Sequence, residues 1–111
     1  MSKLDDKVAL YSQTLTKLGQ KVDEKLLRAV TKGCGPSIYT KDGETVSASD
    51  KAEVERVKKN FMEKKLGLSG KDLDAGFDYA VDVIGKSSRN KYRAVMYYLI
   101  VKKYKKDSVY A

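Results

Sequence analysis

The chain has 111 residues, which is the usual length of one domain. Hydrophobic residues make up 41% of it and charged residues 34%, a balance that excludes a disordered polar tail and a fibrous repeat. The chain has no His and one Cys, so His-dependent catalytic sites, His-ligated metal sites and internal disulfides are excluded.

Apolar residues recur at spacings of three and four along most of the chain, and this period predicts an all-α fold. We expect a compact bundle of about five helices in a single domain at residues 1–106, with a C-terminal tail at 107–111. The stripes are Leu4, Val8, Tyr11, Leu15 and Leu18; Leu26, Leu27 and Val30; Val54, Val57, Phe61, Met62 and Leu66; and Leu73, Phe77, Ala80, Val81 and Ile84.

Several residues mark where the first three helices begin and end. Gly19 ends the first helix, Asp23 caps the second, and Gly33 ends the second. Asp50 and Glu53 have the spacing of a capping box, in which each side chain bonds to the other residue's backbone N–H group. The third helix is therefore expected to begin at this pair.

Residues 36–49 interrupt the helical pattern. They form either a short β-hairpin around the turn signal Asp42-Gly43 or an irregular loop. We favour the loop, which would pack Ile38 and Val46 against the core, because an isolated two-stranded ribbon is only marginally stable.

The last two helices are separated by a short linker. The fourth opens at Ser69 or Lys71 and ends at Gly85, and Ser87 or Ser88 is expected to cap the fifth.

The fifth helix is expected to run to about Tyr104. From Ala94 to Val101 it is apolar on every side, which is typical of a helix at the buried centre of a domain. The other helices should therefore wrap around it.

Cys34 is either a reactive thiol or a small buried residue at a helix end. We favour the buried residue, since the sequence identifies no neighbour that would activate the thiol. A lone Cys fits a reducing compartment, and the start of the chain lacks the pattern of a secretory signal. The longest uncharged apolar run, residues 94–101, is much shorter than the about 20 residues that a membrane helix needs, so we expect no membrane span. Together these features predict a cytoplasmic protein.

The net charge of +8 is concentrated near the C-terminus, because residues 86–111 hold eight basic residues and one acidic residue, for +7. Cations at the start of the fifth helix lie at the positive end of its dipole, so something must offset them. Aspartates of the fourth helix are one candidate, which we favour: Asp72, Asp74, Asp78 and Asp82. The other is a bound phosphate or carboxylate. The candidate anion-binding residues are Lys86, Ser88, Arg89, Lys91 and Arg93.

Arg89 and Arg93 are four residues apart, so on a helix they would share one face and act together. Changing both to Glu is expected to remove polyanion binding while the fold stays intact.

A second basic group lies at the C-terminal end of the fifth helix, where cations are favourable: Lys102, Lys103, Lys105 and Lys106. It is either a solubilising end or a source of attraction for a polyanion. Five tyrosines accompany the basic residues, and aromatic faces stack on single-stranded bases: Tyr92, Tyr97, Tyr98, Tyr104 and Tyr110. We expect Tyr104 and Tyr110 alone among them to be free for stacking.

Three classes of function follow. We favour a small interaction module that meets an acidic protein through its C-terminal basic helix. The alternative is binding of nucleic acid or another polyanion through the same surface. We do not expect an enzyme, a metal or a cofactor, because there is no phosphate-binding loop, dinucleotide fingerprint or cysteine cluster. The oligomeric state is left open.

The chain resembles a known family in two segments. These are Gly35-Pro36-Ser37-Ile38-Tyr39 and Ser88-Arg89-Asn90-Lys91-Tyr92-Arg93-Ala94-Val95, the second followed by Tyr97-Tyr98-Leu99 and Val101-Lys102-Lys103. They are similar to a small bacterial family catalogued as domain of unknown function 2853, and the likeness covers essentially the whole chain. The resemblance implies a stand-alone bacterial protein, and it brings no assigned activity, catalytic residue, cofactor or partner.

Overall fold

The computed structural model describes residues 3–88 and 91–110, apart from the side chains of Lys41 and Asp42. Its helices follow the helical period of the sequence. The principal helices are α1 (Lys3–Lys17), α2 (Glu24–Gly33), α4 (Lys51–Arg56), which continues into the π-helical segment η2 (Val57–Glu63), α5 (Lys71–Ile84) and α6 (Arg93–Lys103). Short turns are η1 (Gly35–Tyr39), α3 (Lys41–Glu44) and η3 (Asp107–Tyr110). No strand occurs in the described residues, so the all-α prediction is confirmed.

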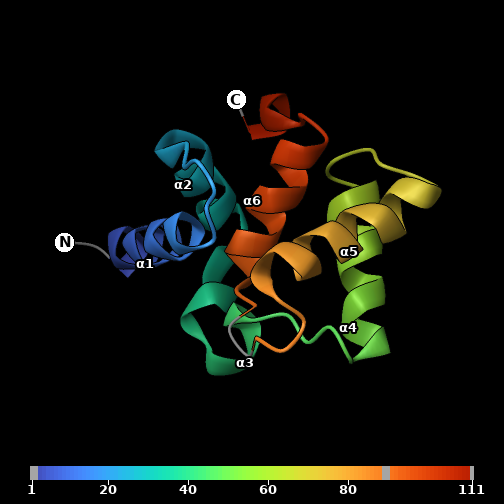
Figure 1. Cartoon of the computed structure of the whole chain (residues 1–111), viewed down its shortest axis with the longest axis horizontal. Coiled ribbons are helices and arrows are strands. Elements are labelled where there is room, and N and C mark those ends of the chain that lie inside the picture. The colour runs from blue at the N-terminus through green and yellow to red at the C-terminus, as the bar shows by residue number, and fades with distance from the viewer. Residues whose placement is uncertain (1–2, 89–90, 111) are drawn as a thin grey trace.

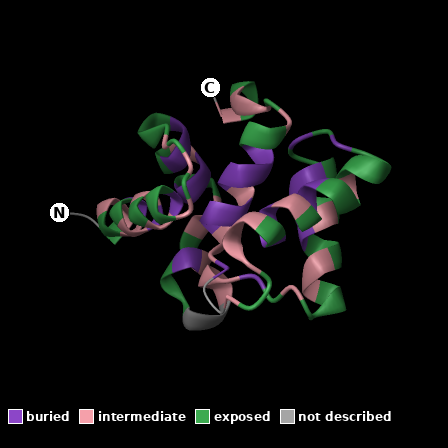
Figure 2. Cartoon of the chain, viewed as in Figure 1, coloured by how far each residue is buried: buried purple, intermediate pink, exposed green. Residues whose placement is uncertain are grey.

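Helix α6 is the centre of the bundle, as its all-round apolar sequence predicts. It lies between α1 and α2 on one side and α5 on the other (Figure 1). Seven of its residues are buried: Ala94, Val95, Met96, Tyr98, Leu99, Ile100 and Val101. Figure 2 shows that the buried positions of the surrounding helices gather around it. Each large apolar side chain buried there contributes about 1.5–3 kcal/mol, so α6 makes a substantial contribution to the fold's stability.

Asp23 caps α2 as expected, whereas at α4 only one of the two bonds of the expected capping box is present. The Asp23 carboxylate accepts a bond from the first turn of α2, and the Asp50 carboxylate accepts two at the start of α4. The capping box is wrong, because the Glu53 side chain does not return to Asp50. It binds the guanidinium groups of Arg56 and Arg93 instead.

Residues 36–49 do not form a hairpin. Two short helical turns, η1 and α3, occupy most of residues 36–44, and residues 45–49 form the irregular part of the loop. The Thr40 hydroxyl caps α3 by accepting from the Gly43 N–H at 3.0 Å. Gly43 is needed for this turn, since a Cβ atom there would lie 2.6 Å from the Ser37 carbonyl oxygen. The packing of Ile38 and Val46 against the core is confirmed, because both are at most 3% exposed.

The start of the last helix was predicted wrongly. Helix α6 begins at Arg93, with Tyr92 as its N-cap, and not at Ser87 or Ser88. Thr45 and Tyr92 form an isolated antiparallel bridge, and the Val46 N–H donates to the carbonyl of residue 91 at 2.8 Å. Tyr92 has extended backbone angles, φ −60° and ψ 132°, and the helix begins after it.

The C-terminal residues 107–110 form η3, which packs on α2. A Cβ atom on Gly33 would lie 3.3 Å from the Tyr110 ring. Tyr110 is half-buried, so the last turn covers part of the α2 surface.

Candidate functional site

The structure divides the five candidate anion-binding residues between different places. Lys86, Ser88 and Lys91 line one cavity. Arg93 lies in a separate side-chain network on α6. Arg89 lies outside the described residues.

Arg93 is bonded to three parts of its own chain. Its Nε donates to the Gly43 carbonyl at 2.9 Å, one terminal nitrogen donates to the Tyr97 hydroxyl at 3.0 Å, and the other donates to Glu53. The side chains of Arg93 and Glu53 are only 16% and 15% exposed. Arg93 therefore ties α3 and α4 to α6 and is largely withdrawn from solvent.

The pKa values of this pair show that both groups stay charged at neutral pH. Burial alone would raise the pKa of Glu53, yet the hydrogen bonds and charges of Arg56 and Arg93 hold it below its ordinary value of 4.5. Burial would lower the pKa of Arg93, but its bonds to Tyr97 and Glu53 raise it.

The aspartates of α5 are not the main intramolecular partners of these cations. Asp82 lies 3.9 Å from Lys86, and both side chains are exposed, so this pair is weak. Asp74 pairs with Lys58 of η2 at 2.5 Å. Glu53, which the capping-box interpretation had assigned another role, neutralises Arg93 instead.

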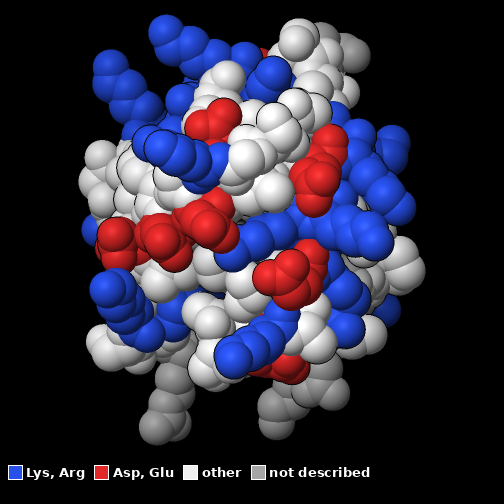
Figure 3. Space-filling view, turned by 90° about the vertical axis from the view of Figure 1, so that its right-hand side faces the viewer, with Lys and Arg blue, Asp and Glu red and all other residues white. Residues whose placement is uncertain are grey.

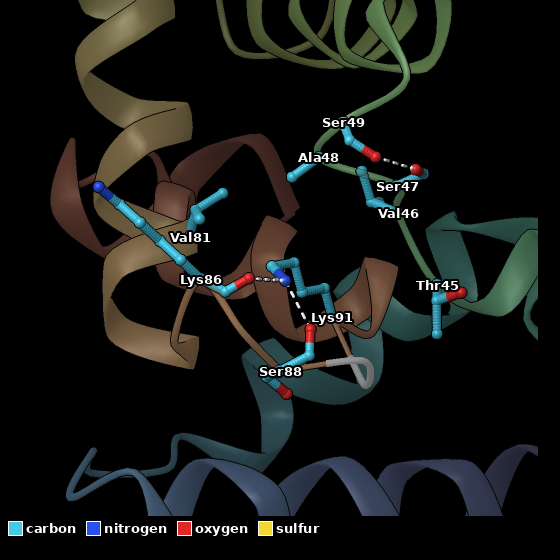
Figure 4. Close-up of a pocket in the computed structure, with 9 residues that line it drawn as sticks. All are labelled: Thr45, Val46, Ser47, Ala48, Ser49, Val81, Lys86, Ser88 and Lys91. Carbon is cyan, nitrogen blue, oxygen red and sulfur yellow. Dashed lines mark hydrogen bonds between the residues drawn. The ribbon is translucent and has the colours of Figure 1, made fainter.

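The cavity that holds the other three candidates lies between residues 45–49 and the segment that leads into α6 (Figure 4). Its volume is about 600 Å³. Lys91 is 7% exposed. Its ammonium group donates hydrogen bonds to the Lys86 carbonyl at 2.9 Å and to the Ser88 carbonyl at 2.5 Å. No carboxylate of the described residues forms a salt bridge with it. Ser47 and Ser49, on the opposite wall, were not anticipated from the sequence.

The second basic group remains at the surface. Lys102, Lys103 and Lys105 are exposed and Lys106 is half-buried; we call these four residues the basic end. Lys102 lies 3.3 Å from Asp107, and both side chains are 45% exposed. Lys and Arg side chains project at the upper edge of the molecule in Figure 3, the edge at which α6 finishes in Figure 1. Asp107 therefore neutralises part of the charge of the basic end, which remains net positive.

The tyrosines near these cations are covered. Tyr97 stacks on Phe61 with ring centres 3.7 Å apart, and Tyr92 packs against Tyr11 at 5.1 Å. Tyr98 is 1% exposed.

The expectation that Tyr104 and Tyr110 are free is wrong. The Lys103 ammonium lies 5.5 Å from the Tyr104 ring centre, and the Lys65 ammonium lies 4.6 Å from that of Tyr110. Both tyrosines are half-buried, and a cation covers a face of each ring.

Cys34 ends α2 and is partly buried. Burial raises the pKa of its thiol to about 11, against the smaller opposing effect of the Arg93 and Lys65 charges. The thiol is therefore protonated at neutral pH, which favours the interpretation of Cys34 as a packing residue over a nucleophile.

Within residues 3–88 and 91–110, none of the helices has both the length and the apolar character needed to cross a membrane. Within the same ranges, no group of three or more Cys, Asp or Glu side chains is placed to hold a metal ion.

The chain matches a protein-family model over most of its length. Residues 10–108 match the model of a family described as "Protein of unknown function (DUF2853)". No curated protein matches the chain. The match covers nearly all of the described fold, from α1 to η3.

Proposed function

Because the chain belongs to a family of proteins of unknown function, DUF2853, we propose its function from its surface chemistry. We propose that it is a small interaction module that binds an acidic segment of a partner protein through the basic end of α6. The observation that supports this is the contrast at one surface between exposed lysine ammonium groups and covered aromatic rings.

The charge at this surface is suited to a carboxylate-rich partner. The end of α6 and the turn to η3 carry four lysines and one aspartate, and only Lys102 among these lysines forms a salt bridge with that aspartate in the described residues. Lys65 brings a further ammonium group beside η3 through its contact with Tyr110. Exposed charges of one sign increase the rate at which a partner of the opposite sign associates, and they favour it over like-charged competitors.

The covered tyrosines favour a protein partner over single-stranded nucleic acid. Base stacking contributes about 1–3 kcal/mol per base, but it requires a ring face that a base can reach. Tyr98 is buried, the half-buried rings of Tyr97 and Tyr92 pack on Phe61 and Tyr11, and a lysine ammonium lies over one face of each of Tyr104 and Tyr110. Binding at this surface therefore depends on charge, which an acidic peptide supplies without stacking.

The test is fluorescence anisotropy with a labelled glutamate-rich peptide, at about 50 and 200 mM salt, because added salt screens exposed charges. We expect saturable binding at the lower salt that weakens at the higher salt. The triple substitution Lys102→Gln, Lys105→Gln and Lys106→Gln should weaken binding about tenfold, which corresponds to about 1.4 kcal/mol.

The matched control removes the same charge from exposed lysines elsewhere, with Lys3→Gln, Lys17→Gln and Lys51→Gln. It should change affinity less than about twofold if location matters more than net charge. Equal losses in the two triple variants would contradict the proposal, as would no binding at the lower salt. Unlabelled duplex DNA and single-stranded RNA serve as competitors, and tighter binding of either would make nucleic acid the ligand.

A further inference from the structure

We propose that the cavity around Lys91 binds a small organic oxyanion, a carboxylate or phosphate group on a short carbon skeleton. This site is independent of the basic end, because the two lie at opposite ends of α6. An eleven-residue helix separates them by about 16 Å. The inference therefore does not depend on the proposed protein partner.

The cavity has the size and the mixed lining of a small-molecule site. Its volume of about 600 Å³ lies within the range of about 300–1,000 Å³ that is usual for ligand pockets. Val46 and Val81, which are 3% and 9% exposed, form an apolar wall together with Ala48. Ser47 and Ser49 add hydroxyl groups at the edge, with their oxygens 3.4 Å apart.

Lys91 supplies the reason for an anion. Its ammonium group has three N–H donors, and two of them bond to the carbonyls of Lys86 and Ser88. Carbonyl oxygens satisfy hydrogen bonds but bring no negative charge. The residue is 7% exposed and forms no salt bridge with a described carboxylate, so a buried positive charge borders the cavity without a counterion. An oxyanion in the cavity would neutralise it.

Lys86 lies at the rim of the same cavity. In Figure 4 its side chain extends along α5 past Val81, whereas Lys91 lies folded between the two walls. The Lys86 ammonium is 3.9 Å from Asp82, in a pair whose side chains are 83% and 63% exposed. Such a pair is weak, so Lys86 can turn to an incoming anion at little cost. While it is paired, it also offsets the repulsion that Asp82 exerts on that anion.

The apolar wall selects the class of ligand. A bare inorganic ion would use Lys91 and the serine hydroxyls but would leave the parts of Val46, Ala48 and Val81 that line the cavity uncovered. A ligand with a short hydrocarbon part uses both halves of the lining. We therefore expect butyrate or butyl phosphate to bind more tightly than acetate or inorganic phosphate.

The experiment is a titration of the isotope-labelled full chain, followed by amide chemical shifts. The probes are butyrate, butyl phosphate and neutral butanol. We expect saturable shifts centred on residues 45–49, Lys86, Ser88 and Lys91 with at least one of the anions, and none with butanol. Shifts with butyrate alone assign the ligand to carboxylates, and shifts with butyl phosphate alone assign it to phosphate esters.

Lys91→Met should lower the affinity at least about tenfold, since it removes the buried charge and keeps a side chain of similar length. The control is Lys17→Met, which removes one exposed lysine charge at the end of α1, outside both the cavity and the basic end, and should leave the affinity unchanged. If Lys91→Met does not fold, Lys86→Met and Ser49→Ala provide the second test, and each should weaken binding. Equal shifts at the basic end, shifts with butanol equal to those with the anions, or no saturable shift would overturn the proposal.

Discussion

Replacing Arg93 by Met should destabilise the fold, because this guanidinium links three segments. The substitution removes bonds to the Gly43 carbonyl, the Tyr97 hydroxyl and Glu53. Breaking a buried ion pair by removing one partner costs about 3–5 kcal/mol. Glu53 keeps its bond to Arg56 at 2.9 Å, so the lower end of the range, about 3 kcal/mol, applies. Against a total stability of about 5–15 kcal/mol, this loss is large.

The assay is thermal and urea unfolding, monitored by circular dichroism. For a domain of this size, about 3 kcal/mol lowers the midpoint temperature by about 12 °C. Arg28→Met is the matched control, because Arg28 pairs with Asp5 at 2.7 Å but the two side chains are 49% and 43% exposed. Its loss should stay below about 1 kcal/mol. An Arg93→Met midpoint within about 4 °C of the wild-type midpoint would refute the structural role assigned to Arg93.

The same network has a pH dependence of known sign. Since the pKa of Glu53 is lowered in the folded state, the stabilisation from this carboxylate is present above its ordinary pKa of 4.5. It is lost as the pH falls through the lower, folded value. Wild-type stability should therefore decrease below about pH 4.5 more steeply than that of Arg93→Met. Parallel pH profiles of the two proteins would contradict the assignment.

Three further predictions concern other parts of the fold. Gly76→Ala should destabilise the protein by about 1–2 kcal/mol in urea unfolding, although Ala has the better helix propensity. The new Cβ atom would lie 2.8 Å from both the Met62 methyl group and the Tyr104 ring. An equal or higher unfolding midpoint would show that both side chains move aside. Cys34 should react with a disulfide reagent at pH 8 about a hundredfold more slowly in the native chain than in urea, since its pKa is about 11 when folded and 9.0 ordinarily; equal rates would contradict its burial. Tyr98→Phe should cost about 1–3 kcal/mol in thermal unfolding, because its buried hydroxyl bonds to two backbone groups before α2, and an unchanged midpoint would mean that water replaces these bonds.

The fold was predictable where local patterns and burial agree. The apolar stripes of α1, α2 and α5 are set by the helical period and do not depend on distant residues. The central place of α6 follows from apolar residues on all its sides, which a surface helix does not have.

Long-range contacts explain where the sequence-based predictions failed. The start of α6 depends on the bridge between Thr45 and Tyr92, which are far apart in the chain. Local spacing assigned Glu53 to a capping box, but its side chain is drawn to Arg93 on α6. The proximity of Arg93 to Glu53 also changes the expectation for the double substitution to Glu, which should now weaken the fold, since it puts two carboxylates together.

Of the candidate site, only the wall formed by the loop before α6 was predictable from the sequence. Lys86, Ser88 and Lys91 lie together because one short loop carries them. Ser47 and Ser49, on the facing wall, belong to a segment about 40 residues earlier, and no local pattern associates them with this loop.

The most direct test of the proposed function is to map where an acidic peptide binds. Amide chemical shifts of the full chain should be recorded during titration with the glutamate-rich peptide at low salt. We expect the largest shifts at residues 102–106 and at Lys65, with little change at Lys86, Ser88 and Lys91. Largest shifts at residues 86–91, or shifts spread evenly over all exposed lysines, would contradict a partner site at the basic end.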